Sequence, residues 1–253
     1  MKKHLVWLAI LAAVGGCVPS GAIAPDGKHL AKVKANSLEV YDPAGHRLAT
    51  LGGGNVRSWI WGQGGRSLVV RGRDGTRRYD LGTKAWSTVV APVDFLLAEG
   101  SEGSVGGYHK GFVEVWKGGN RLYRAAAKPQ PVGMLLQKSD LPVWWSGNQL
   151  WVASRATQAP LRFGADITDV QPGRDDSLTV VLQRSAKDEF GAERPSYSLA
   201  KVTWDGRADK PPLALSSLDI AFGRMPFFNT QLVVSPEGRL AALITEAQAE
   251  PGV

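Results

Sequence analysis

Cysteine, histidine and serine are the side chains here that could act as metal ligands or nucleophiles. The chain has a single cysteine, Cys17, and outside the first sixteen residues its histidines stand alone at His29, His46 and His109. It has no HExxH or CxxC pattern that would bring zinc ligands together. No Gly-x-Ser-x-Gly frame presents a nucleophilic serine, and no glycine-rich run ends in the Gly-Lys-Ser/Thr of a phosphate loop. We therefore expect no catalytic residue, no metal and no cofactor. The Cys17 thiol is the group whose surroundings suggest a reaction.

The residues before Cys17 have the features of an export signal. Two lysines precede an apolar run over residues 5–14, which is too short to cross a bilayer stably. The run ends in Val14-Gly15-Gly16-Cys17, which resembles the lipobox of bacterial lipoproteins. The resemblance implies a signal peptide over residues 1–16, cleavage before Cys17 and lipidation of Cys17. The alternative is an ordinary signal peptide cut after Gly16 or at Ala24, with Cys17 incidental.

The lipobox resemblance also implies a cellular location. Val18, rather than aspartate, follows the cysteine. In Gram-negative lipoproteins this implies sorting to the outer membrane, facing the periplasm. Residues 17–22 would form the lipidated tether, of which Val18 to Ala22 reach at most about 18 Å when extended. The expected membrane contact is thus the lipid anchor itself.

Composition favours a turn-rich folded domain. The 253 residues are 43% hydrophobic and 21% charged, with 30 glycines and 15 prolines. The net charge of +7 falls to about +5 once Lys2 and Lys3 leave with the signal. Nucleic acid is not an expected partner, because no zinc-finger, RNP or helix-turn-helix pattern is present. With one cysteine the chain forms no internal disulfide, so its stability depends on core packing.

Turn residues recur along the chain at a nearly constant spacing. Pro25-Asp26-Gly27 lies between two apolar runs, and Pro236-Glu237-Gly238 repeats this frame near the other end. Between them the turn positions are separated by 38, 38, 37 and 36 residues, at Gly27, Gly65, Gly103, Asp140 and Asp176. Most intervals hold four short apolar runs. In the third and fourth they are fewer: in the third we expect strands at 95–97, 112–116 and 121–123. A period near 38 with several short strands is typical of propeller blades.

The Pro-Asp-Gly-x-x-Leu-Ala form resembles the repeats of TolB-like and WD40-like (PD40-type) bacterial propellers. We therefore predict an all-β fold, a β-propeller of about six four-stranded blades over residues 23–253. The last blade is expected to be short, because only two good strands remain there. A polar segment at 186–194 is expected to be an exposed loop inserted in the fifth unit. A β-sandwich or barrel is the alternative fold.

Three other groups of residues are candidates for binding. The tryptophan cluster could stack a planar ligand, but inter-blade core packing is the preferred interpretation. The basic group could form an anion-binding strip, although a solvated blade edge is preferred. A local acidic group is a weak candidate for a metal. These groups are Trp144, Trp145 and Trp151; Arg66, Arg71, Arg73, Arg77 and Arg78; and Asp166, Asp169, Asp175 and Asp176.

Together these features favour a membrane-anchored periplasmic lipoprotein that acts as a binding or scaffold platform for an envelope protein or polymer. The alternative function is that of a propeller enzyme, such as a quinone- or sugar-dependent dehydrogenase or a lactonase. Such an enzyme would need convergent polar side chains at the channel mouth. A purely structural protein is the third possibility.

Overall fold

The structure is a computed structural model, and it describes residues 21–24, 28–35, 37–52, 56–62, 64–100, 102–154, 159–172, 177–187, 193–203, 213–214, 228–234 and 241–247. Within these ranges all regular secondary structure is β-strand. A search of the same ranges finds no helix with the length and apolar character needed to cross a membrane. The chain divides into two compact units, Met1–Val143 and Trp144–Val253, which are described separately.

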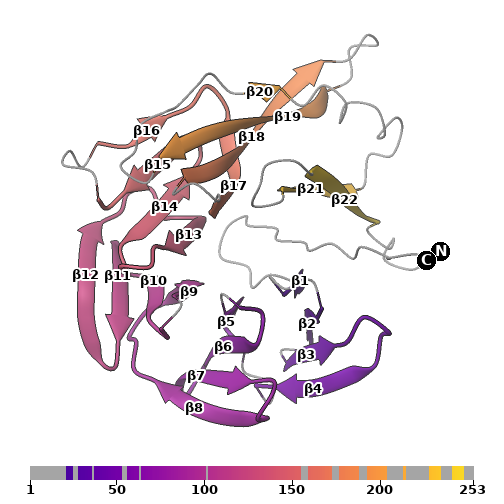
Figure 1. The fold of residues 1–253 in the computed structure, drawn as a ribbon, viewed down its shortest axis with the longest axis vertical. Helices are drawn as coiled ribbons and strands as arrows, with labels where there is room; N and C mark the ends of the chain where they lie inside the picture. Colours follow the sequence, from indigo (N-terminus) through magenta and orange to yellow (C-terminus); the bar gives the residue numbers. More distant parts are fainter. Residues whose placement is uncertain are drawn as a thin grey trace. The chain divides into compact units, whose positions relative to one another are not determined.

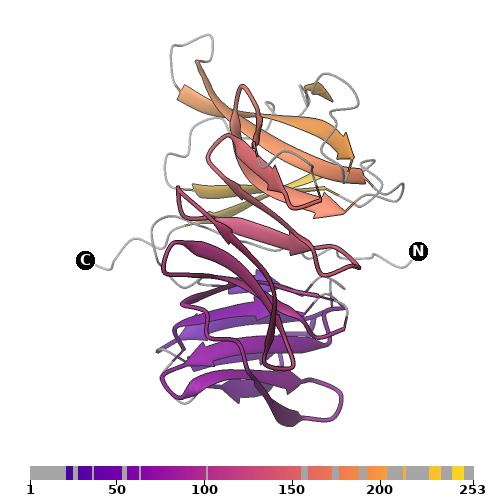
Figure 2. The same ribbon diagram turned by 90° about the vertical axis from the view of Figure 1, so that its left-hand side faces the viewer.

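The first unit contains three four-stranded antiparallel sheets, each made of four strands that are consecutive in the chain (Figure 1). The first sheet is β1 (Gly21–Ile23), β2 (Leu30–Lys34), β3 (Ser37–Tyr41) and β4 (Arg47–Leu51). The second is β5 (Ser58–Trp61), β6 (Ser67–Gly72), β7 (Gly75–Asp80) and β8 (Ala85–Val89). The third is β9 (Phe95–Glu99), β10 (Val105–His109), β11 (Phe112–Lys117) and β12 (Asn120–Ala126). Figure 2 shows the strands of this unit running side by side in alternating directions.

Strand β6 shows how these sheets pack. Leu68 and Val70 belong to a buried cluster shared with the first sheet, whereas Val69, on the opposite face of the strand, packs with Val93 and Val105. Successive side chains of a strand point to opposite faces of its sheet. An uninterrupted apolar run is therefore stable in β6 only because both faces of the second sheet are covered by neighbouring sheets.

Hydrogen bonds also join neighbouring sheets. The Trp61 Nε1 group donates to the Ala22 carbonyl at 3.0 Å, which links the second sheet to the first. The Leu96 amide donates to Ser58 Oγ at 3.3 Å, and the first strands β5 and β9 lie side by side. Each of these bonds joins residues almost one repeat apart in sequence, so the period is also the spacing of the contacts between sheets.

The turns between second and third strands confirm the predicted period. Lys34 pairs with Ser37, Gly72 with Gly75, and His109 with Phe112, so each turn has two residues. In the third sheet both turn residues have positive φ, 46° at Lys110 and 90° at Gly111, as a type I′ hairpin requires. The third strands begin at Ser37, Gly75 and Phe112, and β15 begins at Gln149, giving spacings of 38, 37 and 37.

The division between the two units falls within β14. The fourth sheet has the order β13 (Gly133–Leu136), β14 (Pro142–Ser146), β15 (Gln149–Val152) and β16 (Leu161–Arg162). The fifth has the order β17 (Asp166–Pro172), β18 (Ser177–Lys187), β19 (Glu193–Thr203) and β20 (Leu213–Ala214). The last described sheet pairs only β21 (Phe228–Val234) with β22 (Ala241–Ala247).

The hairpin of β18 and β19 changes the interpretation of the polar segment at 186–194. Ala186 pairs with Arg194 and Lys187 with Glu193, so strand pairing continues into the segment that was expected to be loop. A polar sequence can extend a strand here because the hairpin backbone satisfies its own hydrogen bonds. Residues 188–192 lie outside the described part of the chain.

Candidate functional site

The third sheet carries a buried carboxylate surrounded by aromatic and basic side chains. Alternation along β11 places Phe112, Glu114 and Trp116 on one face. Arg121 and Arg124 of the neighbouring strand β12 complete the group, which we name the Glu114 cluster. The Glu114 side chain is only 2% exposed, so its charge must be compensated by neighbouring donors.

A β-bulge brings both arginines to Glu114. Glu114 is directly opposite Arg124, Val115 is opposite Tyr123, but Trp116 is opposite Arg121, so β12 contains one extra residue at Leu122. In a regular strand, residues three apart point to opposite faces. The bulge removes this restriction and re-aims Arg121 toward the face of Glu114. Leu122 itself is left 49% exposed.

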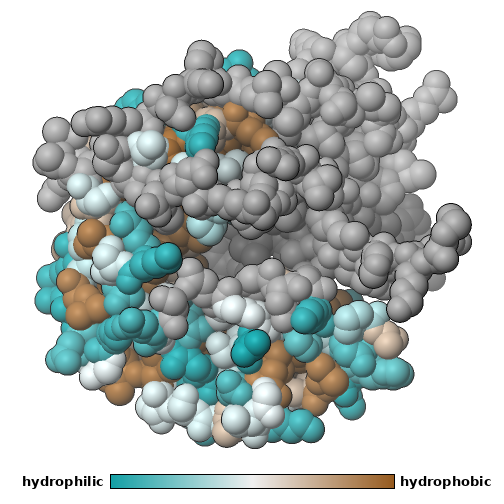
Figure 3. Space-filling view, in the orientation of Figure 1, coloured by the Kyte–Doolittle hydropathy of each residue, from teal (hydrophilic) through white to brown (hydrophobic). Residues whose placement is uncertain are grey.

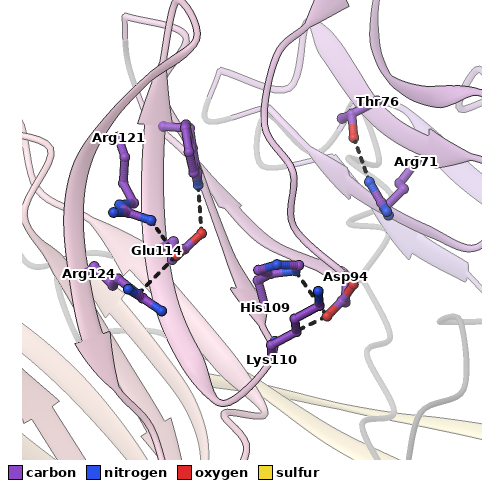
Figure 4. Close-up of polar contacts among 9 residues, drawn as sticks. Arg71, Thr76, Asp94, His109, Lys110, Glu114, Arg121 and Arg124 are labelled. Atoms are coloured by element: carbon purple, nitrogen blue, oxygen red, sulfur yellow. Dashed lines mark hydrogen bonds and ion pairs between the residues drawn. The ribbon is translucent and has the colours of Figure 1, made fainter.

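The two guanidinium groups converge on one carboxylate oxygen (Figure 4). Arg121 Nη1 lies 3.2 Å and Arg124 Nε 3.3 Å from Glu114 Oε1, while Trp116 Nε1 donates to Oε2 at 3.0 Å. Arg124 Cζ lies 3.7 Å from the centre of the Phe112 ring, and Arg121 Cζ lies 5.6 Å from that of Trp116. Stacking and ion pairing together fix the orientation of both arginines.

The first sheet contains a simpler version of the same arrangement. Glu39 and Tyr41 occupy the positions of Glu114 and Trp116, and Arg47 binds Glu39 at 2.9 Å across a bulge at Leu48. Two hydrogen bonds lower the pKa of Glu39 below its usual range. The larger effect comes from the Tyr41 hydroxyl and the smaller from Arg47. Thr50 lies opposite Glu39, where the third sheet has Arg124 opposite Glu114. One arginine and one aromatic donor are thus sufficient for a buried glutamate here.

The second sheet has the opposite charge at this position and divides the candidate basic strip. Arg77 occupies the place of the glutamates and lies 5.0 Å from the ring of Trp86 on β8. Arg78, on the opposite face of β7, forms an ion pair with Glu99 and donates to the Gly103 carbonyl at 3.0 Å. The candidate anion-binding strip is therefore not one surface, because Arg77 and Arg78 lie on opposite faces of β7. Arg66 and Arg73 are exposed.

Arg78 and Glu99 also line a cleft of about 520 Å³ within the first unit, together with Ser67 and Glu102. Glu99 is fully engaged: one oxygen accepts from Arg78 and the other from Ser67 Oγ at 3.1 Å. At the edge of the cleft, Lys117 forms ion pairs with Glu102 and Asp140. In Figure 3 the visible described surface is a mosaic of hydrophilic and hydrophobic residues.

In the second unit the tryptophan cluster packs into the core, as the preferred interpretation of the sequence predicted. Trp144 and Trp145 are buried, and the rings of Trp144 and Trp151 are stacked in parallel with centroids 6.0 Å apart. Of the acidic group, Asp166 is exposed and Asp169 lies on the same strand, β17. Asp175 and Asp176 lie outside the described residues, as does Cys17.

The three histidines are separated in the structure. His29 lies against Trp61, with ring centroids 6.4 Å apart. His46 Nδ1 is 3.1 Å from Asp42, and His109 Nδ1 is 3.2 Å from Asp94 (Figure 4). In the part of the chain that the structure describes, no group of three or more His, Cys, Asp or Glu side chains is arranged to hold a metal ion.

Asp169 provides a prediction about pH. Burial raises its pKa, although hydrogen bonds from Gln171 and the Val170 amide act in the opposite direction. The folded chain thus holds this proton to a higher pH than the unfolded chain does, so the free energy of unfolding falls as pH rises from about 3.9 through the folded pKa. We expect Asp169→Asn to raise the thermal midpoint at pH 7, with a gain that shrinks as the solution is acidified.

The measurement is thermal unfolding followed by circular dichroism between pH 3 and pH 7. Asp166→Asn, at an exposed position on the same strand, is the matched control and should show no such trend. A midpoint lowered at pH 7 by Asp169→Asn would mean that hydrogen bonds to the charged carboxylate outweigh its burial.

Sequence reasoning did not identify the Glu114 cluster. Its signal is present in two stretches, Glu39-Val40-Tyr41 followed by Arg47-Leu48, and Glu114-Val115-Trp116 followed by Arg121-Leu122. When the repeats are aligned by the starts of their third strands, Glu39 matches Glu114, and an arginine follows each of them, eight residues later at Arg47 and seven residues later at Arg121. The turn positions that define the period do not bring these charges into comparison.

No family model matches the chain, and no curated protein matches it. Among solved structures, Hsv2p of Kluyveromyces lactis, a yeast β-propeller, is similar with a TM-score of 0.53 at 12% identity, covering 89% of this chain and 70% of that one. A protein of unknown function from Bacteroides caccae has a TM-score of 0.45 at 10% identity, covering 79% of this chain and 81% of that one. The consecutive four-stranded sheets and the likeness to Hsv2p show a propeller-like fold, and at this identity they show the fold alone.

Proposed function

We propose that this chain is a lipid-anchored β-propeller of about six blades, with a short last blade, that serves as a binding platform in the bacterial cell envelope. The anchor would be an acylated Cys17, and the domain would face the periplasm from the outer membrane. The partner would be an envelope protein or polymer. The proposal combines the export and lipobox pattern of residues 1–17 with the propeller-like fold.

The observation that carries the binding role is the preorganised Glu114 cluster. Its two arginines are 43% and 44% exposed, yet both are fixed by an ion pair and an aromatic ring. Fixing such long side chains before a ligand arrives reduces the entropy lost on binding. A rigid, partly exposed cationic surface is therefore suited to recognition.

The alternative of a propeller enzyme receives less support from the cleft of the first unit. Among the described residues that line this cleft, Ser67 has a hydroxyl bonded to a possible base, but its partner Glu99 is held by Arg78 as well. Both oxygens of Glu99 already accept hydrogen bonds, and no histidine is found among the described residues that line this cleft. The polar groups of the cleft are thus arranged as a closed ion-pair network.

Metabolic labelling with a fatty-acid analogue tests the anchor. We expect the full chain to become labelled and Cys17→Ser to abolish the label, because the motif offers one thiol for acylation. Mass spectrometry should place the new N-terminus at residue 17. Equal labelling of the two proteins, or an N-terminus generated at Ala24, would contradict the anchor and support an ordinary secreted domain.

A further inference from the structure

The first and third sheets are natural controls for one another. In both, a buried glutamate on the third strand accepts hydrogen bonds from an aromatic donor two residues later and from a bulge-directed arginine. In the first sheet the directly bonded set, Glu39 with Arg47, has no net charge, and Lys34 acts on Glu39 only through space. In the third sheet Arg124 is added opposite Glu114, so the same set carries one positive charge more.

This extra charge is not needed to compensate Glu114. The first sheet shows that one arginine and one aromatic donor satisfy a buried glutamate at this position. Arg124 instead places a second guanidinium beside the first, where both bind the same carboxylate oxygen. Like charges at this distance repel one another, and an external anion would relieve the repulsion.

The exposed parts of the two arginines suit an oxyanion. A guanidinium carries five N–H donors, and one nitrogen of each side chain is directed at Glu114. Both side chains are more than two-fifths exposed, so donors remain accessible to solvent. Planar guanidinium groups match the spacing of phosphate oxygens better than an ammonium does, and two of them can bind three or more of those oxygens.

We propose that Arg121 and Arg124 form a binding site for a phosphate group on the outer strand of the third sheet, with Glu114, Phe112 and Trp116 as positioning residues. The ligand is either a lipid phosphate headgroup or a free phosphate. The site does not depend on acylation of Cys17. An edge strand also carries charges to prevent aggregation, but such charges do not require stacking or a buried carboxylate.

The test uses the full chain carrying Cys17→Ser, so that acylation contributes nothing to membrane binding. One arm measures flotation with vesicles of phosphatidylglycerol or of phosphatidylcholine, and the other titrates inorganic phosphate by calorimetry. Arg124→Thr converts the third sheet to the pattern of the first. It should weaken binding about tenfold, as expected for loss of a charged hydrogen bond. Arg124→Lys should lose an intermediate amount, because it keeps the charge without the planar fork.

Arg47→Gln removes the arginine of the first sheet and should change binding less than twofold. Arginine-dependent flotation with phosphatidylglycerol identifies a headgroup, and arginine-dependent phosphate binding without flotation identifies a free phosphate. If Arg124→Thr and Arg47→Gln lose the same amount of binding, the effect comes from the overall charge of the protein, and the proposed site is wrong. So would binding of neither probe by a protein whose thermal unfolding shows that it is folded.

Discussion

Gly107→Ala is expected to destabilise the first unit by about 3 kcal/mol, at the upper end of the usual range for overpacking. A Cβ at this position would lie 2.4 Å from the Phe95 carbonyl oxygen and 2.8 Å from Val93 Cβ. Backbone and a branched side chain cannot move away as a flexible side chain can. Strands β9 and β10 would therefore have to separate.

Chemical denaturation of the two proteins checks this expectation. Gly64→Ala is the matched control, because a Cβ there meets nothing within 4 Å and its φ is not positive. The control should remain within about 0.5 kcal/mol of the unsubstituted chain. A Gly107→Ala protein as stable as this control would show that β9 and β10 do not approach as described.

Glu114→Gln should also be strongly destabilising, by about 2 kcal/mol. The amide keeps the shape of the side chain but removes the charge that two arginines and Trp116 bind. Hydrogen bonds to charged groups contribute about 1.5 to 3 kcal/mol each, and the partial exposure of the arginines reduces this figure.

Glu102→Gln is the matched control for the charge. Glu102 pairs with Lys117, but its side chain is 72% exposed, so its loss should cost less than about 1 kcal/mol. Urea unfolding of the three proteins compares the losses. Equal effects of the two substitutions would mean that burial of Glu114 adds nothing to its ion pairs.

Gly107 and its neighbour Gly106 also explain why one strand was missed from the sequence. The predicted third unit had strands at 95–97, 112–116 and 121–123 but none at Val105–His109, where Gly106-Gly107 interrupts the apolar pattern. In the structure these glycines form the middle of β10. They are required by close packing: a Cβ on Gly106 would lie 2.4 Å from the Met134 sulfur. Such contacts arise from the fold and cannot be read from local propensity.

The repeat itself was predictable for a physical reason. Each sheet needs a turn between its first and second strands, and Gly65, Gly103 and Asp140 each lie in such a turn with positive φ, so turn residues recur wherever a sheet recurs. The run Leu68-Val69-Val70 could likewise be predicted as a strand buried on both faces. Turn residues and apolar runs are local properties of the sequence. They were therefore enough to predict a succession of small sheets along the chain.

The Glu114 cluster was not predictable in the same way. Arg121 and Arg124 are three residues apart, and regular alternation assigns them to opposite faces of β12. Only the bulge at Leu122 brings them together at Glu114. A bulge depends on the register of two paired strands, and this register is known only from the structure. Comparison of the first and third sheets then shows that Arg124 is the additional charge.

Fractionation of cells that express the full chain tests the central claim most directly, because it asks where the propeller-like domain is held. The unsubstituted chain should stay in the membrane pellet after washing with about 1 M salt, which screens ionic contacts but does not remove an acyl anchor. The Cys17→Ser chain should appear in the soluble fraction. Recovery of both proteins in the soluble fraction, or of both in the salt-washed pellet, would contradict a lipid-anchored platform.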